Sequence, residues 1–274
     1  MFVDVIIPTF NRVSTLDRAI QSVLNQTYKN YKLFIVDDGS TDNTQELLSQ
    51  YSKHPQITLL KQSNQGVSAA RNFAVNSSNS PWISFLDSDD EWLPQKLEKQ
   101  VLYLTQSPEC RFLHSEEIWI RNGVRVNPKL KHNKGAIDLF KRSLEFCLIS
   151  PSTVIMKRDL FIQYGPFDES FTVCEDYDLW LKILAFEEVG FLADFVTNKY
   201  GGHADQLSTQ FVAMDYWRLK SLINLLNVVK NQSHREMILL EIQKKAPILL
   251  KGYQKHQNNQ RFEEVSMMVK DFLI

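Results

Sequence analysis

The chain has 274 residues, of which 43% are hydrophobic, enough for one large domain or one and a half with a full core. Its formal net charge is -1 with interspersed charges, which excludes the global basic field expected of a nucleic-acid-binding protein. Three scattered cysteines form no C-x-x-C pair, so a reducing, cytoplasmic compartment is expected. No apolar run approaches the roughly 18 residues of a membrane span, and no secretory signal is expected at the N-terminus.

Apolar runs and amphipathic stretches alternate through the first hundred residues. We expect strands at residues 3–7, 32–36, 57–60 and 82–86, and helices at 14–25, from the turn at 37–42 to about 51, at 67–76 and at 94–107. Ser14 to Asp17 resembles a capping box, and Pro94 suits the first turn of a helix. This alternation predicts a mainly parallel sheet with helices on both faces.

Four carboxylates crowd into five positions directly after the fourth strand, in Asp87-Ser88-Asp89-Asp90-Glu91. Neighbouring carboxylates raise one another's pKa unless they share a cation, and oxygen-rich clusters suit Mg²⁺ or Mn²⁺. A solvated acidic turn is the competing interpretation, because a short Asp-x-Asp pattern alone does not decide between the two.

Polar clusters also follow the first and second strands, which would bring all three clusters to one edge of the sheet, where ligands bind in such folds. No G-x-G-x-x-G follows the first strand and no G-x-x-x-x-G-K-[ST] occurs, which excludes a dinucleotide fingerprint and a phosphate loop of those kinds. The edge is therefore expected to form a nucleotide crevice of another kind.

Beyond residue 110 the pattern is mixed. Residues 118–126 predict a hairpin with Asn122-Gly123 as its type I′ turn, 149–156 a loop and strand, 158–164 a short helix, and 179–186 a helix preceded by three acids. From about residue 206 the pattern predicts helices throughout, with one apolar face formed by Leu219, Leu222, Leu226 and Val229. Two interpretations of the basic loop at 129–135 stay open: a mobile, solvated loop, or a contact for phosphate or lipid headgroups.

Five motifs, in order along the chain, carry a resemblance to a known family. They are Pro8-Thr9-Phe10-Asn11-Arg12, Val36-Asp37-Asp38-Gly39-Ser40-Thr41-Asp42, Asn64-Gln65-Gly66-Val67-Ser68-Ala69-Ala70-Arg71-Asn72, Asp87-Ser88-Asp89-Asp90 and Glu175-Asp176-Tyr177-Asp178-Leu179-Trp180. Over about residues 3–205 the chain resembles the inverting family 2 glycosyltransferases of the GT-A fold.

The resemblance implies an α/β GT-A fold with a Rossmann-like, mainly parallel central sheet, flanking helices, a small acceptor-side β element and a helical C-terminal extension. It implies a glycosyltransferase domain at residues 1–205, with a nucleotide-binding half at 1–110 and an acceptor-binding half at 111–205. The helical extension would then occupy residues 206–274.

The resemblance also implies the donor side of a site. Asp89 matches the family's ligand for Mn²⁺ or Mg²⁺, and His203 resembles a histidine that can touch the metal or the diphosphate. Donor nucleotide binding is implied for Pro8, Thr9, Asn11, Arg12, Asp38, Arg71 and Asp87. Because a carboxylate accepts a hydrogen bond from N3–H of uracil or thymine, Asp38 favours a uridine or thymidine donor.

Structural interpretations of some of these residues stay open. Arg71 suits an ion pair, with Asp37 as one partner, as well as a contact to the diphosphate. Asp90 suits a solvent-facing helix cap as well as a position behind the metal ligands. A lone histidine such as His203 is often structural.

On the acceptor side, Asp176 matches the family's catalytic base, and Glu175 an acceptor or orienting contact. Inverting transfer needs a base that takes the acceptor hydroxyl's proton while its oxygen attacks the anomeric carbon opposite the leaving diphosphate. Adjacent carboxylates can lift one pKa toward a useful value.

The expected enzyme is a metal-dependent glycosyltransferase that moves a sugar from a UDP- or dTDP-linked donor to a saccharide or lipid-linked acceptor in bacterial surface polysaccharide synthesis. Nucleic acid is not an expected partner, whereas peripheral contact with the inner face of the cell membrane and a homodimer stay open. The alternatives are a non-catalytic nucleotide-sugar binding protein, which would lack the Asp89 or Asp176 position, and a sugar nucleotidyltransferase. The latter needs a glycine-rich first loop, and the loop at residues 8–12 has no glycine.

Overall fold

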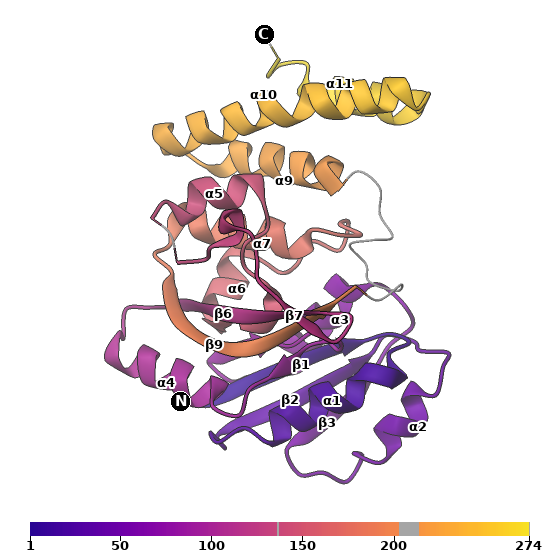
Figure 1. The fold of residues 1–274 in the computed structure, drawn as a ribbon, viewed down its shortest axis with the longest axis vertical. Coiled ribbons are helices and arrows are strands. Elements are labelled where there is room, and N and C mark those ends of the chain that lie inside the picture. The colour runs from indigo at the N-terminus through magenta and orange to yellow at the C-terminus, as the bar shows by residue number, and fades with distance from the viewer. Residues whose placement is uncertain (136, 203–213, 274) are drawn as a thin grey trace.

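A nine-stranded sheet runs through the computed structural model, which describes residues 1–135, 137–202 and 214–273 (Figure 1). The strand order is β3-β2-β1-β4-β8-β6-β9-β5, with β7 paired to β6. The first four strands are parallel: β1 (Val3–Thr9), β2 (Tyr31–Asp37), β3 (Ile57–Lys61) and β4 (Trp82–Phe85). The predicted parallel sheet is therefore confirmed, and the carboxyl ends of β1, β2 and β4 lie at one edge.

Helices cover both faces of this parallel part. They are α1 (Val13–Leu24), α2 (Thr44–Ser49), α3 (Val67–Asn76) and α4 (Lys96–Gln106). Side chains alternate along β1, so that Val5 packs with the α1 side of the core and Ile6 with the α3 side. The sheet is thus buried on both faces, as its apolar strands predict.

Two predicted helix starts in the parallel half of the chain differ from the structure. Helix α1 begins at Val13 with no side-chain cap from its own residues, because the backbone N–H of Val13 donates to Asp42 Oδ2 (3.3 Å) in the turn after β2. A tertiary contact therefore replaces the predicted capping box. Pro94 lies in the turn before α4, which the backbone N–H of Lys96 closes by donating to Leu93 O (3.0 Å), so the helix begins two residues later than predicted.

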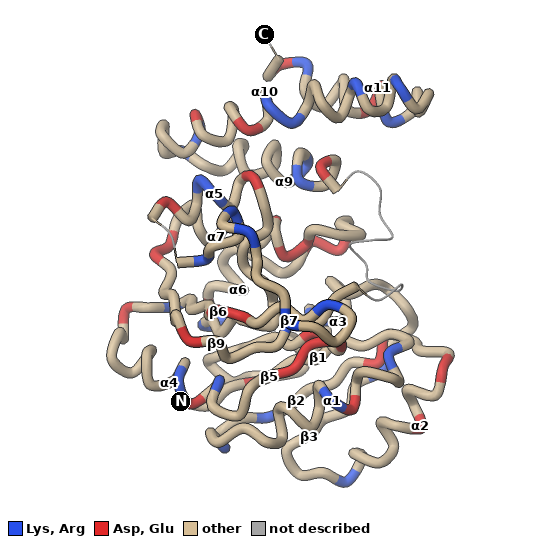
Figure 2. Tube along the Cα trace, viewed as in Figure 1, with Lys and Arg blue, Asp and Glu red and all other residues tan. Residues whose placement is uncertain are grey.

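The second half of the sheet is mixed. It contains β5 (Glu91–Trp92), β6 (Phe112–Arg121), β7 (Val124–Val126), β8 (Ile155–Lys157) and β9 (Gly190–Gly201). Asn122 and Gly123 have φ values of 49° and 76°, and positive φ at both positions is what a type I′ turn requires, so the predicted hairpin is confirmed. The segment between β7 and α5 (Leu139–Glu145) carries a run of Lys and Arg, which returns below (Figure 2).

Two further helices, α6 (Arg158–Tyr164) and α7 (Glu175–Phe186), pack on the sheet. The predicted helix at 179–186 starts too late, because Glu175, Asp176 and Asp178 lie inside the first turn of α7. Acids are stabilised there by the positive end of the helix dipole. Asp176 is consequently presented from the N-terminal end of a buried helix.

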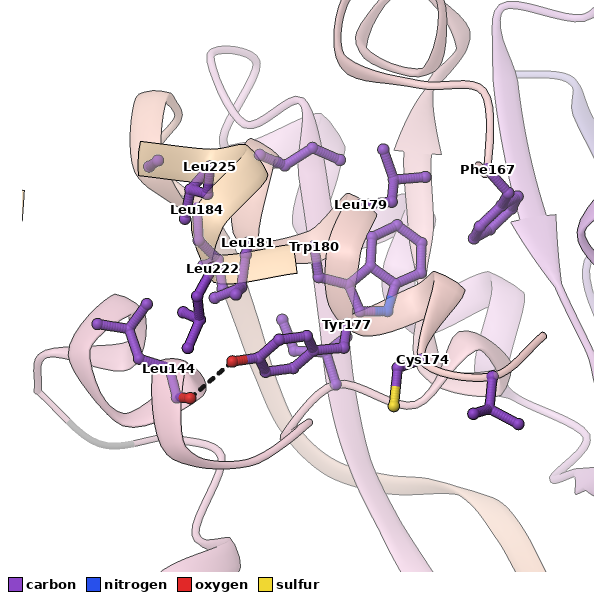
Figure 3. Close-up of a cluster of buried hydrophobic side chains, with 14 of the residues drawn as sticks. Leu144, Phe167, Cys174, Tyr177, Leu179, Trp180, Leu181, Leu184, Leu222 and Leu225 are labelled. Carbon is purple, nitrogen blue, oxygen red and sulfur yellow. Dashed lines mark hydrogen bonds between the residues drawn. The ribbon is translucent and has the colours of Figure 1, made fainter. Parts of the chain in front are cut away.

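Three helices, α9 (Met214–Val228), α10 (Gln232–Lys255) and α11 (Asn259–Val269), stack at the end of the molecule distant from β1–β3 (Figure 1). The predicted apolar face is confirmed, because all four of its residues are buried: Leu219, Leu222, Leu226 and Val229. Figure 3 shows Leu222 and Leu225 of α9 packed beside Leu181 and Leu184 of α7. The predicted boundary near residue 205 lies outside the described residues.

None of the described helices combines the length and hydrophobicity that a bilayer crossing requires.

Lys96 is the first residue of α4, and its side chain is fully buried. Its Nζ donates to Gln100 Oε1 (2.8 Å) and lies 3.8 Å from the ring centroid of Trp92. Burial holds the pKa of Lys96 well below its ordinary value of 10.5. The indole N–H of Trp92 donates to Ser152 O (2.8 Å), so this packing continues toward the edge of the sheet where the acids lie.

Lys96→Met should change the pH dependence of stability. Because the folded-state pKa lies below the unfolded value, the unfolded chain binds more protons, and wild-type stability rises with pH through this window. Methionine does not titrate. The difference between the unfolding free energies, wild type minus variant, should therefore increase from about pH 8 to about pH 10. Denaturant unfolding at both pH values measures this difference, with exposed Lys255→Met as the control. An increase that is absent, or equal in the control, would contradict the buried-lysine account.

Candidate active site

A cavity of about 260 Å³ opens at the edge of the sheet where β1 and β4 end, and α7 and β9 close its other side. Seven of the predicted site residues line it: Pro8, Arg12, Arg71, Asp87, Asp89, Glu175 and Asp176. An adjoining pocket is lined by Pro8 and Arg12 again, together with Thr9 and Asp38. The structure therefore brings residues from all five motifs to two neighbouring hollows.

Thr9 and Asp38 shape the second of these pockets. The backbone N–H of Asp38 donates to Thr9 O (2.9 Å), which joins the ends of β1 and β2. Within the described residues, the buried hydroxyl of Thr9 has no hydrogen-bond partner. The Asp38 carboxylate accepts from Gln62 Nε2 (2.7 Å) and from the backbone N–H groups of Gln65 (2.9 Å) and Gly66 (2.8 Å). Asp38 thus fixes the loop before α3 while lining the pocket.

Asn11 has a structural position beside this pocket. Its backbone is in the left-handed region, with φ at 52°, and its Oδ1 accepts from the backbone N–H groups of Thr41 (2.8 Å) and Asp42 (3.3 Å). It therefore holds the turn that follows β2. Asn11 does not line either pocket, and its predicted contact with the nucleotide stays a prediction.

The acids after β4 have different environments. Asp90 is 2% exposed, and its carboxylate accepts from Ser152 Oγ (2.6 Å) and from the backbone N–H of Tyr200 (3.0 Å). Burial, followed by repulsion from Asp89 and Asp87, raises the pKa of Asp90 well above its ordinary value. The interpretations of a solvated turn and of a solvent-facing cap are therefore wrong for Asp90.

Asp87 and Asp89 face the cavity on either side of Ser88. Asp89 is held through its backbone, since its carbonyl accepts from Arg18 Nη2 (2.5 Å), and its side chain also borders a third hollow beside the start of α1. Asp87 N–H donates to Ser152 Oγ (3.1 Å). Ser152 therefore organises the turn through both Asp87 and Asp90.

Arg71 joins the two sides of the cavity. Its Nη2 donates to Asp87 Oδ1 (2.7 Å) and its Nη1 to Glu175 Oε1 (2.6 Å), while the side chain is 3% exposed. Burial alone would lower the pKa of Arg71, but Asp87 and Glu175 outweigh it and raise that pKa. The ion-pair interpretation of Arg71 is confirmed, although the partner suggested for it, Asp37, instead accepts from Ser40 N–H (2.9 Å).

Glu175 and Asp176 are adjacent in sequence but differ in surroundings. Burial raises the pKa of Glu175 to about 6, Arg71 opposes that rise, and Asp176 adds to it. Asp176 is partly exposed in the cavity, and its Oδ2 accepts from the Cys147 thiol (3.3 Å). Of the two carboxylates, Asp176 is therefore the more accessible to a substrate, and Glu175 is committed to Arg71.

Lys199, on β9, is a cavity residue that the sequence did not reveal. Its Nζ donates to Ser150 Oγ (2.6 Å) and lies 4.0 Å from Glu117 Oε1. Burial would lower the pKa of Lys199, but Glu117 and Asp90 outweigh it and raise that pKa. The ammonium therefore places positive charge beside the acidic turn. No local motif marks this lysine, because its position depends on the pairing of β9 with β6.

The carboxylates of Asp87 and Asp89 fit a divalent cation that is shared with a ligand. Mg²⁺ in nucleotide sites uses one or two carboxylates together with phosphate oxygens and water, so a cluster of three protein ligands is not required. In the described ranges, no group of three metal-ligating side chains occurs. His203 lies outside the described residues, and the metal site stays a prediction.

Residues 4–165 match the model of glycosyl transferase family 2. WfgD of Escherichia coli, named a UDP-Glc:alpha-D-GlcNAc-diphosphoundecaprenol beta-1,3-glucosyltransferase, is 33% identical over 72% of this chain and 76% of its own. WfaP of Escherichia coli, which has the same enzyme name, is 31% identical over 87% and 90% of the two chains.

An uncharacterized glycosyltransferase of Rickettsia felis is 34% identical over 69% of this chain, but the match spans 31% of that longer protein. Among solved structures, Staphylococcus aureus TarS 1-349, crystallised in complex with UDP-GlcNAc, superposes with a TM-score of 0.73. At 18% identity, over 89% of this chain and 71% of that one, this likeness establishes the fold. The chain belongs to glycosyl transferase family 2 and has the GT-A fold of that family.

Proposed function

We propose that this chain is an inverting, metal-dependent glycosyltransferase. It would move a sugar from a UDP- or dTDP-linked donor to a saccharide or lipid-linked acceptor in the synthesis of a bacterial surface polysaccharide. The observation that carries the proposal is that Asp89, after β4, and Asp176, at the start of α7, line one cavity. A donor-side acid and a candidate base thus face the same space from two different elements.

The nucleoside would occupy the pocket of Thr9 and Asp38, where the unpartnered hydroxyl of Thr9 offers a hydrogen bond. The diphosphate would then lie toward Asp89 and Lys199, which line the neighbouring cavity. Lys199 would offset the charge of the departing diphosphate. This placement leaves the acceptor hydroxyl near Asp176, which would take its proton as the hydroxyl oxygen attacks the anomeric carbon.

Asp89, with Asp87 beside it, would hold the Mn²⁺ or Mg²⁺ ion. When bound, such an ion neutralises charge on the leaving diphosphate as a Lewis acid. Arg71 would keep Asp87 ionised and oriented, because its guanidinium bonds to Asp87 Oδ1.

The names of the relatives support the finer parts of the proposal. WfgD and WfaP are named as enzymes that use UDP-glucose and a diphosphoundecaprenol-linked acceptor. A uridine donor and a lipid-linked acceptor are therefore our first choices, and peripheral contact with a membrane would follow from such an acceptor. A homodimer stays a prediction. The two alternatives receive less support, because Asp89 and Asp176 are both present in the cavity and the loop after β1 lacks glycine.

A donor screen tests the nucleotide and the metal together. UDP-, dTDP- and GDP-sugars are titrated with and without Mn²⁺, and a UDP- or dTDP-sugar should bind most tightly, with higher affinity when Mn²⁺ is present. Asp89→Ala should bind its donor equally with and without Mn²⁺, because the carboxylate that would hold the ion is gone. Exposed Glu263→Ala is the matched control. A Mn²⁺ dependence that survives in Asp89→Ala would overturn the assignment of the metal ligand.

Asp176→Asn should lower turnover by about 10²–10⁴-fold, the usual contribution of a positioned general base. Binding of UDP and the thermal midpoint should change little, since the substitution keeps the size of the side chain. Turnover under saturating donor and acceptor, with calorimetric UDP binding in parallel, measures both effects. Asp159→Asn, on the surface of α6, is the control. Near-wild-type turnover in Asp176→Asn would assign the base to another residue.

Glu175 should give the reaction an acid limb. Because the pKa of Glu175 is about 6, the carboxylate is protonated below that pH and its ion pair with Arg71 is lost. We expect kcat/KM of the wild type to fall as the pH drops through about 6. Glu175→Gln cannot titrate there, so its lower kcat/KM should lack that limb. The same midpoint in both proteins would exclude Glu175 as its source.

A further inference from the structure

The segment from Arg121 to Arg142 is strongly basic, although the whole chain has a net charge of -1. It contains seven Lys and Arg residues and a single acid, Asp138. We call its described residues, 121–135 and 137–142, the basic strap. Figure 2 shows Lys and Arg along the strap where it passes from β7 toward α5. The segment therefore carries a net charge of +6, whereas the rest of the chain carries a net charge of -7.

The strap also displays aliphatic side chains to solvent. Leu130 and Ile137 are 92% and 89% exposed, the highest values among the large hydrophobic residues that the structure describes. Val124, on β7, is 64% exposed. Burial of these aliphatic side chains against a partner would be favourable, and their place on one basic segment indicates a contact surface.

Side-chain contacts hold the strap against the rest of the protein. Lys134 turns inward, and its Nζ lies 3.0 Å from Glu117 Oε2 with both side chains buried. Arg142 donates to Asn133 O (2.6 Å) and Lys131 O (3.1 Å), which ties α5 to the short 3₁₀ helix at Leu130–His132. The interpretation of a freely solvated loop is therefore wrong for Lys134. Leu130 remains exposed on a segment that is held from both sides.

The ion pair of Lys134 with Glu117 also reaches the active-site cavity. Glu117 lies between Lys134 of the strap and Lys199 of the cavity, at 3.0 Å and 4.0 Å. Attraction to the two lysines overcomes burial and lowers the pKa of Glu117 to about 2, so the carboxylate stays charged. What binds to the strap is consequently held close to the place where an acceptor would enter.

We propose that the basic strap rests on an anionic membrane surface. Leu130 and Ile137 would insert among the lipids, while Arg125, Lys129 and Lys131 would contact phosphate headgroups. Exposed aliphatic side chains among basic residues suit this partner, because lipid binding adds buried apolar area to electrostatic attraction. Nucleic acid would use stacking aromatic groups in place of aliphatic tips. This proposal rests on the proposed function in one respect: an enzyme that acts on a lipid-linked acceptor must reach the membrane that holds it.

The test measures co-sedimentation of the full chain with vesicles of phosphatidylcholine alone or mixed with phosphatidylglycerol. Wild type should bind the mixed vesicles and release them as salt rises. Lys129→Gln with Lys131→Gln should lower the partition coefficient by about 25-fold, which is about fivefold for each lysine. Leu130→Ser with Ile137→Ser should weaken binding already at low salt, where the basic residues still attract the vesicles. The matched control, Lys251→Gln with Lys255→Gln near the end of α10, should stay within about twofold of wild type.

Equal binding to both kinds of vesicle, or unchanged binding by the strap variants, would overturn the proposal. The proposal would also be overturned if the wild-type chain does not bind vesicles but self-associates, and if Leu130→Ser with Ile137→Ser abolishes that self-association. The strap would then be a protein interface. Sugar transfer to a water-soluble acceptor separates this proposal from the previous one. If wild type binds mixed vesicles but transfers no sugar, the proposed function is wrong and the proposal of a membrane-binding strap still holds.

Discussion

The site depends on the two ion pairs that the buried guanidinium of Arg71 forms. The guanidinium lies between Asp87, which belongs to the turn after β4, and Glu175, which begins α7, and its charge is balanced on both sides. Removing one partner of a buried pair typically costs about 3–5 kcal/mol, because the other charge is left uncompensated. The two sides of the cavity are therefore held at a fixed separation by one residue of α3, a helix that otherwise serves to cover the sheet.

This clamp assigns different tasks to two adjacent carboxylates. Glu175 is buried against Arg71, whereas Asp176 is partly exposed in the cavity beside the Cys147 thiol. One turn of helix thus supplies both a fixed support and an accessible oxygen. The same division recurs in the acidic turn, where Asp90 is buried on Ser152 and Tyr200 while Asp89 faces the open space.

Local patterns along the chain were sufficient for the parallel strands, the Asn122-Gly123 turn and the motifs that line the cavity. They failed where a partner distant in sequence decides the outcome. Val13 is capped by Asp42 rather than by its own helix, and Lys199 reaches the acids because β9 pairs with β6. The burial of Asp90 likewise depends on Ser152, 62 residues away. Tertiary contacts of this kind leave no spacing signal in a single sequence.

The contacts of Asp90 have a consequence for how this architecture is assembled. The four motifs that supply Pro8, Asp38, Arg71 and Asp89 lie in the first 110 residues, yet the turn that carries Asp87 and Asp89 is shaped by Ser152 and by the backbone of β9. The predicted nucleotide-binding half at residues 1–110 is therefore contiguous in sequence, but its acidic turn is not held by its own residues alone. The shape of the acidic turn therefore depends on contacts that the predicted acceptor-binding half supplies through Ser152 and Tyr200.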